Sequence, residues 1–260
     1  MKNTKAFHRF TIHSSRTERL IKLGGIGIDQ EKEQLEEILF KFRNVKGKPG
    51  KIPADFEPEI SVENDKDEKT LELTVDERTA FVLKQALEFT RSSTEELHNH
   101  LFSIYLVYMW GAFETYILMM FEELFEKKPE MLQTNEKISY SDLIKNKSDV
   151  LGFVIDNELE KIGHFSLDKY VAYLDDKINY KITKANNTKL EQIYLLRNIV
   201  AHNTGIVSNR LKSKIPKALK VKEGELFITK KYLETEMKTI VKIVTDIENH
   251  VQKKFGKNVA

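Results

Sequence analysis

The sequence predicts an all-α protein with a small β-hairpin, and three observations lead to this prediction. Most segments between residues 76 and 255 repeat apolar residues every three or four positions, which places them on one face of an α-helix. Segments that alternate as a β-strand does are short and few. A composition of 40% hydrophobic and 32% charged residues is typical of a folded, helix-rich chain. We therefore expect an all-α, helix-rich domain with an N-terminal appendage.

Composition and charge limit the possible functions. The chain has no cysteine, which excludes disulfide bonds, thiolate metal sites and cysteine nucleophiles and fits a cytoplasmic location. A formal net charge of +2 does not by itself indicate nucleic-acid binding, so such a role depends on where the basic residues lie. The polar, basic segment from Met1 to Arg19 lacks the apolar core of a secretory signal. We expect a cytoplasmic protein.

Residues 1–75 are expected to form an N-terminal arm and a small α/β appendage, outside a helical domain of residues 76–255. In residues 1–28, weak alternation precedes a glycine-rich turn, so we expect a flexible or partner-dependent arm. A short amphipathic helix, a proline-rich loop and a small hairpin are expected to follow. Their residues are 29–42, 47–58 and 60–75.

The longest helical pattern begins at Asp76, an expected N-cap, and ends near Lys127. A capping-box sequence at residues 93–96 leaves open whether this is one kinked helix or two helices. Residues 101–121 are apolar enough to cross a bilayer, with Glu114 as their one charged residue. Because this charge lies in mid-segment and no basic residues flank the segment, we favour a buried central helix over a membrane span.

Three further helices are expected after the central helix. Their residues are 141–161, 166–178 and 188–203. Thr188 is the expected N-cap of the third helix. Residues 206–221 alternate weakly and residues 226–229 are strand-like, so two strands with a turn at Glu223 and Gly224 are expected. Residues 230–255 carry the apolar stripe of a final amphipathic helix.

The end of the helix expected at residues 188–203 combines polar side chains with an apolar surface. One helical turn separates Asn198 from His202, and Arg197 lies at the edge of the face that they share. An arginine among core positions needs an anionic partner or a role in binding. His202 also lies near a helix C-terminus, where the macrodipole favours its protonated form. These three residues are therefore a candidate phosphate site.

Glu114 is the candidate partner of Arg197. Its neighbours on the central helix are apolar, and a buried carboxylate needs a cation or a hydrogen-bond donor. We expect an ion pair between the two helices. The alternative is that Glu114 reaches a cavity or the solvent.

Residues 203–222, which we name the basic ribbon, contain six basic residues and no acidic one. A run of this kind directly after Arg197 and His202 suits a groove that follows a nucleic-acid backbone. The alternative is an exposed hairpin whose lysines protect a strand edge. The RNA-binding candidates are Arg210, Lys212, Lys214 and Lys217.

His98 and His100 point in different directions on a helix, so they do not form a metal site. We expect no metal ion and no other cofactor.

Two segments resemble a known family. Residues 197–202, Arg-Asn-Ile-Val-Ala-His, are similar to the signature of HEPN domains, an arginine and a polar residue followed closely by a histidine. Residues 108–116 resemble the central-helix pattern of bacterial members, in which aromatic residues precede a glutamate. The resemblance covers residues 76–255 and implies an all-α, HEPN-like antiparallel bundle. The helices between residues 136 and 180 look like an insertion into it.

The resemblance implies a metal-independent endoribonuclease. In this family the 2′-OH of the RNA attacks the adjacent phosphate, so neither a metal ion nor a protein nucleophile is required. His202 would act as general acid/base, Arg197 would hold the phosphate, and Asn198 would orient His202 or the phosphate. The family usually builds its groove at a two-fold interface, so a homodimer is expected. Members often serve as bacterial toxins or antiviral-defence effectors, which implies an antitoxin or regulatory partner.

Two other hypotheses remain open. A non-catalytic HEPN module would use Arg197 and His202 as core or nucleotide-binding groups and would bind a partner. A membrane-associated helical protein would be built on residues 101–121, whereas the first two hypotheses involve no membrane.

Overall fold

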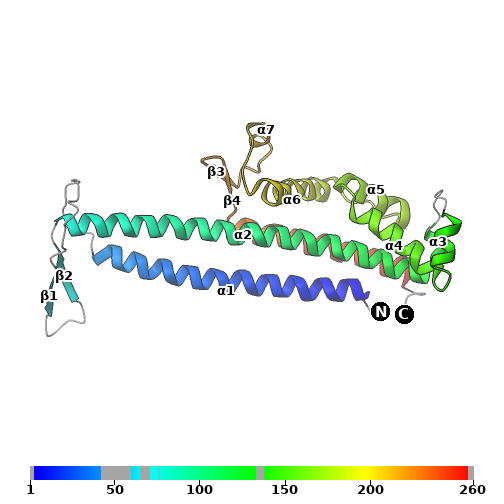
Figure 1. The fold of residues 1–260 in the computed structure, drawn as a ribbon, viewed down its shortest axis with the longest axis horizontal. Helices are drawn as coiled ribbons and strands as arrows, with labels where there is room; N and C mark the ends of the chain where they lie inside the picture. Colours follow the sequence, from blue (N-terminus) through cyan, green and yellow to red (C-terminus); the bar gives the residue numbers. More distant parts are fainter. Residues whose placement is uncertain (1–2, 42–59, 65–70, 76, 133–137, 257–260) are drawn as a thin grey trace. The chain divides into compact units, whose positions relative to one another are not determined.

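The computed structural model is mostly helical, as the sequence predicts (Figure 1). It describes the chain in five stretches: residues 3–41, 60–64, 71–75, 77–132 and 138–256. The chain divides into two compact units, each described by itself below. The larger unit comprises residues 1–21 and 102–260, and the smaller unit comprises residues 22–101.

The smaller unit contains a two-stranded antiparallel sheet. Its strands are β1 (Ile60–Asn64) and β2 (Leu71–Val75), and Ile60 lies opposite Val75. The small hairpin expected from the sequence is therefore present. The loop expected at residues 47–58 and the N-cap expected at Asp76 lie outside the described residues.

Helix α1 (Lys5–Lys41) corrects the expectation of a flexible arm. The glycine-rich segment near residue 25, expected to be a turn, lies inside this helix. Positions four or seven residues apart on α1 are buried in the larger unit: Ala6, Phe10, Thr17 and Ile21. Because small and polar residues occupy part of this stripe, its helical period is hard to recognise in the sequence.

Two carboxylates from other helices cap the first turn of α1. Thr4 donates its backbone N–H to Glu248 Oε1 and its hydroxyl to Glu248 Oε2, both at 2.8 Å. Ala6 donates its N–H to Glu123 Oε1 at 2.8 Å. The first N–H groups of a helix have no partner inside the helix, and negative charge is favourable there. The carboxylates thus hold the start of α1 in the larger unit.

The core of the larger unit is built around α2 (Glu77–Lys127) and α8 (Lys230–Phe255). α2 is one continuous helix through residues 93–96, which settles the choice left open by the capping-box sequence. Residues 96–127 of α2 have the length and composition to cross a membrane. Half of their most apolar stretch is buried inside the protein. The large side chains of α2 in this core include Trp110, Phe113, Tyr116, Phe121 and Phe125.

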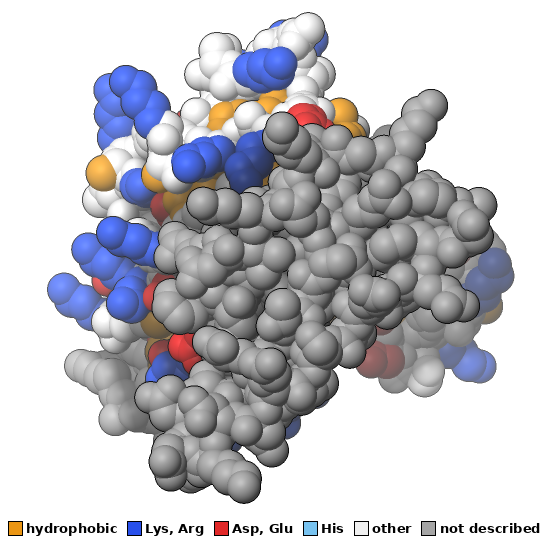
Figure 2. Space-filling model, turned by 90° about the vertical axis from the view of Figure 1, so that its left-hand side faces the viewer, with side chains coloured by type: hydrophobic (Ala, Val, Ile, Leu, Met, Phe, Trp, Pro, Cys, Tyr) orange, Lys and Arg blue, Asp and Glu red, His pale blue; other side chains and the backbone are white. Residues whose placement is uncertain are grey.

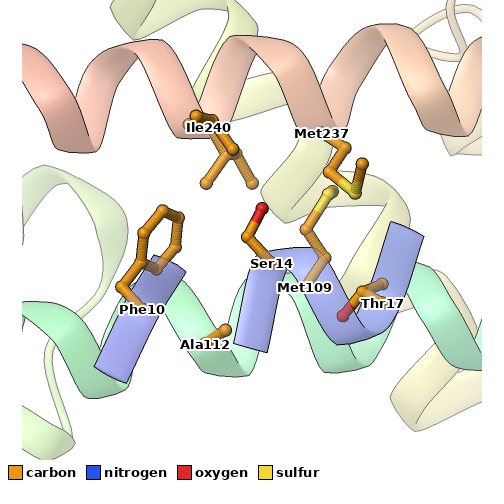
Figure 3. Close-up of a pocket in the computed structure, with 8 residues that line it drawn as sticks. Phe10, Ser14, Thr17, Met109, Ala112, Met237 and Ile240 are labelled. Atoms are coloured by element: carbon orange, nitrogen blue, oxygen red, sulfur yellow. The ribbon is translucent and has the colours of Figure 1, made fainter. Parts of the chain in front are cut away.

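α1, α2 and α8 pack around a small cavity of about 10 Å³ (Figure 3). A cavity of this size holds at most about one water molecule. The lining comprises Phe10, Ser14, Thr17, Met109, Ala112, Met237, Ile240 and Val241.

Short helices connect α2 to the motif helix. They are the 3-10 helix η1 (Pro129–Leu132), α3 (Tyr140–Lys145), α4 (Val150–Gly163) and α5 (Leu167–Ile178). The single helix expected at residues 141–161 is thus wrong, since α3 ends at the C-cap Asn146. A new helix begins after Asp149, whose Oδ1 accepts the N–H of Gly152 at 2.7 Å. Two capping residues therefore interrupt the helical pattern.

The motif helix, α6 (Lys184–Asn203), begins earlier than expected. Its N-cap is Thr183, whose hydroxyl accepts the N–H of Asn186 at 3.3 Å, so the cap expected at Thr188 is wrong. Thr188 lies one turn inside the helix. The Asn-rich segment that precedes it forms the first turn, although Asn favours caps and turns.

The hairpin after α6 is shorter than expected. Residues 206–219 contain the short helix α7 (Asn209–Lys212) rather than a long strand. The paired strands are β3 (Lys220–Lys222) and β4 (Glu225–Phe227). Glu223 and Gly224 form the expected turn, with φ of 50° and 90°. Two positive φ values in succession are typical of a two-residue hairpin turn, which explains the glycine.

Candidate functional site

The motif helix ends immediately after its polar residues. Thr204 adopts a left-handed conformation with φ of 50°, and Gly205 follows with φ of 87°. Gly205 donates its N–H to the carbonyl of Ile199 at 3.1 Å, which closes the last turn. The buried side of α6 anchors the helix in the core and leaves the polar residues toward its outer edge. The buried residues are Leu190, Ile193, Leu196 and Ile199.

Arg197 is held on two sides. Its Nη2 lies 3.8 Å from Glu114 Oε2, the ion pair between α6 and α2 that the sequence led us to expect. Its Nη1 donates a hydrogen bond of 2.9 Å to Asn198 Oδ1. The side chains of Arg197 and Glu114 each keep 25% of their surface exposed, so solvent reaches the pair. The cation is neutralised without being sealed inside the core.

Trp110 fixes the other oxygen of Glu114. The Trp110 Nε1–H donates to Glu114 Oε1 at 2.6 Å, one helical turn away on α2. The indole is fully buried and packs on the ring of Tyr194 from α6, with centroids 5.3 Å apart. A continuous set of polar contacts therefore runs from Trp110 through Glu114 and Arg197 to Asn198.

Tyr170 on α5 is a buried tyrosine whose ionisation is affected by the charges of this cluster. Burial raises the pKa of its phenol well above the usual range, and the Glu114 carboxylate raises this pKa further. The guanidinium of Arg197 acts in the opposite direction. The phenol of Tyr170 is therefore neutral at physiological pH. Neither Trp110 nor Tyr170 was expected at this site from the sequence, because both have the pattern of ordinary core aromatics.

His202 lies outside this set of contacts. It is exposed in the last turn of α6, one helical turn beyond Asn198. In the part of the chain that the structure describes, no hydrogen bond or ion pair holds its ring. Asn198 binds Arg197 rather than His202. The structure thus brings together Arg197, Asn198 and Glu114 and leaves His202 accessible next to them along the helix.

The basic ribbon is attached directly to the end of α6. Leu226 donates its N–H to the carbonyl of Gly205 at 2.9 Å, and Val207 donates to the carbonyl of Gly224 at 2.8 Å. These bonds join the β3–β4 hairpin to the residues that close the motif helix. Val207 and Leu226 are also buried, which anchors the segment.

The charged side chains of the ribbon point outward. Figure 2 shows Lys and Arg side chains over the upper part of one face, where Figure 1 has α7 and β3. Lys222 also lies over the ring of Phe227, with Nζ 4.6 Å from the centroid. The ribbon therefore forms a positive surface next to the end of the motif helix. All six basic residues are exposed: Arg210, Lys212, Lys214, Lys217, Lys220 and Lys222.

Metal-ligating side chains do not gather near this site. Among the described residues, no group of three or more His, Asp or Glu side chains has the arrangement of a metal site. The chemistry available at the end of α6 is that of an arginine, a histidine, an amide and a carboxylate. Comparisons with protein-family models, with curated proteins and with solved structures found no match to this chain.

Proposed function

We propose that the protein is a metal-independent endoribonuclease that acts at the end of α6. The observation that carries this proposal is the direct attachment of the basic ribbon to the helix end that bears Arg197 and His202. A positive surface that follows an RNA backbone would bring its phosphates to these two residues. The HEPN resemblance of residues 197–202 supports the same reaction.

In the proposed reaction, the 2′-OH of a ribose loses its proton and its oxygen attacks the adjacent phosphorus. The bond to the 5′-oxygen of the next nucleotide breaks, and that oxygen takes up a proton. The products are a 2′,3′-cyclic phosphate and a 5′-hydroxyl. His202 transfers protons, because an accessible imidazole can act as both general base and general acid. Arg197 stabilises the negative charge that develops on the phosphate oxygens.

This reaction favours a homodimer. One step needs a base for the 2′-OH and an acid for the leaving oxygen, and each chain supplies a single His202. A two-fold interface that joins two α6 ends would supply both groups in one groove. Asn198 supports the site by accepting a hydrogen bond from the guanidinium of Arg197. A cytoplasmic toxin or antiviral-defence role with an antitoxin or regulatory partner belongs to this proposal through the resemblance alone.

A second candidate is a non-catalytic HEPN module that binds a nucleotide or a partner protein. The observation that favours it is the neutralisation of Arg197 by Glu114, together with its bond to Asn198. A cation held in this way can serve to join α6 to α2. In this module the exposed His202 and the ribbon would contact a ligand without cleaving it.

A cleavage assay in EDTA separates the two candidates. Purified wild-type protein, His202→Ala and His164→Ala would be incubated with a long RNA. His164 is exposed at the end of α4 and serves as the matched control. We expect cleavage by the wild type and the control, with cyclic phosphate ends, and none by His202→Ala. Cleavage that survives in His202→Ala would refute the assignment of His202, and RNA binding without cleavage in all three would favour the module.

A further inference from the structure

The two oxygens of Glu114 have unequal contacts. Oε1 accepts the Trp110 N–H at 2.6 Å, a short and strong hydrogen bond within α2. Oε2 lies 3.8 Å from Arg197 Nη2, a distance for charge attraction without a hydrogen bond. Glu114 is therefore fixed by Trp110, and its contact with Arg197 is the looser of the two.

Arg197 keeps unused capacity to bind an anion. Nη1 donates one hydrogen bond to Asn198, and among the described residues Nη2 makes only the long contact with Glu114. An arginine guanidinium carries five N–H donors in a planar fork that suits two oxygens of one phosphate. Because a quarter of each side chain is exposed, an anion from solvent can approach the pair.

We propose that Glu114 occupies the anion site of Arg197 as an internal competitor, which a phosphate group must displace. The phosphate takes Nη2, whereas Glu114 stays on α2 through its bond to Trp110. The inference rests on the proposed function only in taking a phosphate group as the ligand. Glu114 thus keeps Arg197 neutralised in the free protein and opposes any anion that arrives.

The role of Glu114 has two physical parts. Its charge must be separated from Arg197 before a phosphate binds, and it then repels the bound phosphate. Glu114→Gln removes both effects but keeps an amide oxygen that can accept the Trp110 N–H. The substitution isolates the charge from the packing. For a partly exposed ion pair, we expect phosphate to bind about threefold to fivefold more tightly in this variant.

Trp110 provides the readout. It is the only tryptophan in the chain, and its indole N–H contacts Glu114 directly. Displacement of Arg197 from Glu114 changes the charge next to the indole. Inorganic phosphate should therefore change the fluorescence of the wild type in a saturable way. Chloride at equal ionic strength should not.

The experiment titrates inorganic phosphate into wild type, Glu114→Gln, Arg197→Lys and Glu126→Gln, with Trp110 fluorescence and calorimetry as readouts. Glu126 is an exposed carboxylate on the same helix and controls for net charge. We expect tighter binding in Glu114→Gln, unchanged binding in Glu126→Gln and loss of the saturable signal in Arg197→Lys. Weaker or unchanged binding in Glu114→Gln would overturn the inference, as would a wild type whose fluorescence does not respond.

The outcomes distinguish this inference from the proposed function. Tighter phosphate binding in Glu114→Gln with no RNA cleavage would leave the internal competitor standing and refute the ribonuclease. His202-dependent cleavage with unchanged phosphate binding in Glu114→Gln would support the ribonuclease and refute the internal competitor. If Glu114→Gln does not fold, the fluorescence response of the wild type to phosphate and its loss in Arg197→Lys test whether phosphate displaces Arg197 from Glu114.

Discussion

Thr4, just before α1, donates both its N–H and its hydroxyl to the two oxygens of Glu248 on α8. Tyr116 and Gln252 donate to the same carboxylate, at 3.3 and 3.0 Å. Glu248 is 2% exposed, so this buried charge is accommodated by four hydrogen bonds and by the start of a helix. The N-terminal segment is thereby part of the core of the larger unit.

We expect Glu248→Ala to lower the free energy of unfolding by at least ~2 kcal/mol, because it leaves several buried donors without an acceptor. The variant should also speed hydrogen exchange at the amides of the first turn of α1. Chemical denaturation and hydrogen exchange measure the two effects. Glu160→Ala, which removes an exposed carboxylate on α4, is the matched control. Equal stability of Glu248→Ala and this control would show that the contacts do not hold α1.

Glu114→Ala should destabilise the protein by about 1–3 kcal/mol. The substitution removes the acceptor of the buried Trp110 N–H and the counter-ion of Arg197. Glu114→Gln should be milder, since it keeps the acceptor. Thermal or chemical unfolding of the two variants, compared with Glu126→Ala, measures the difference. A melting temperature of Glu114→Ala equal to that of the wild type would show that the ion pair has no structural role.

Glu236 on α8 should make stability depend on pH. Burial raises the pKa of its carboxyl above 4.5, and Lys189, 3.5 Å away, only partly opposes this. A carboxyl group whose pKa is higher in the folded state than in the unfolded state makes its full contribution to folding stability at pH values below the unfolded pKa. That contribution is lost as the pH rises through the folded pKa. The ionised form of Glu236 therefore lowers stability at neutral pH.

Glu236→Gln should accordingly match the wild type near pH 4 and be more stable at pH 7. Its amide N–H would also offer a donor to the buried Tyr232 hydroxyl one helical turn away, for which the described residues provide no partner. Unfolding free energies measured between pH 4 and pH 8 test this. If Glu236→Gln instead loses stability relative to the wild type as the pH rises, the prediction is wrong.

The basic ribbon should control how RNA binding depends on salt. Replacing Lys212, Lys214 and Lys217 by Gln should weaken RNA binding. It should also reduce the magnitude of the negative slope of log binding constant against log salt concentration by about 2. The control replaces three exposed lysines elsewhere: Lys145, Lys147 and Lys169. Fluorescence anisotropy with a labelled RNA at several salt concentrations gives the slopes. If both triple variants reduce the slope equally, the ribbon is not the RNA path.

Local patterns predicted the fold where a segment carries its own signals. α8 has the expected bounds because its apolar stripe is long and regular, and the hairpin turns where Glu223 and Gly224 supply positive φ. α1 escaped recognition because its start depends on Glu123 and Glu248, which are distant in sequence. The cap at Thr183 was missed because Thr188 offered an equally good local pattern.

The candidate site was predictable where a charge demanded a partner. A glutamate in an apolar helix and an arginine in a core helix led to the Glu114–Arg197 pair, which the structure contains. The burial of Tyr170 on α5 depends on how helices from different parts of the chain pack against one another, which no local pattern of residues reports. The bond from Trp110 joins residues one helical turn apart on α2, but Trp110 has the pattern of an ordinary core aromatic.

The proposed chemistry at Arg197 and His202 is tested most directly with an RNA oligonucleotide that the protein cleaves and its copy with 2′-deoxyribose at the cleaved position. In EDTA, we expect the wild type to convert the first into a 2′,3′-cyclic phosphate and a 5′-hydroxyl and to leave the copy intact. His202→Ala should cleave neither. Cleavage of the 2′-deoxy copy, or full activity of His202→Ala, would contradict the proposed mechanism.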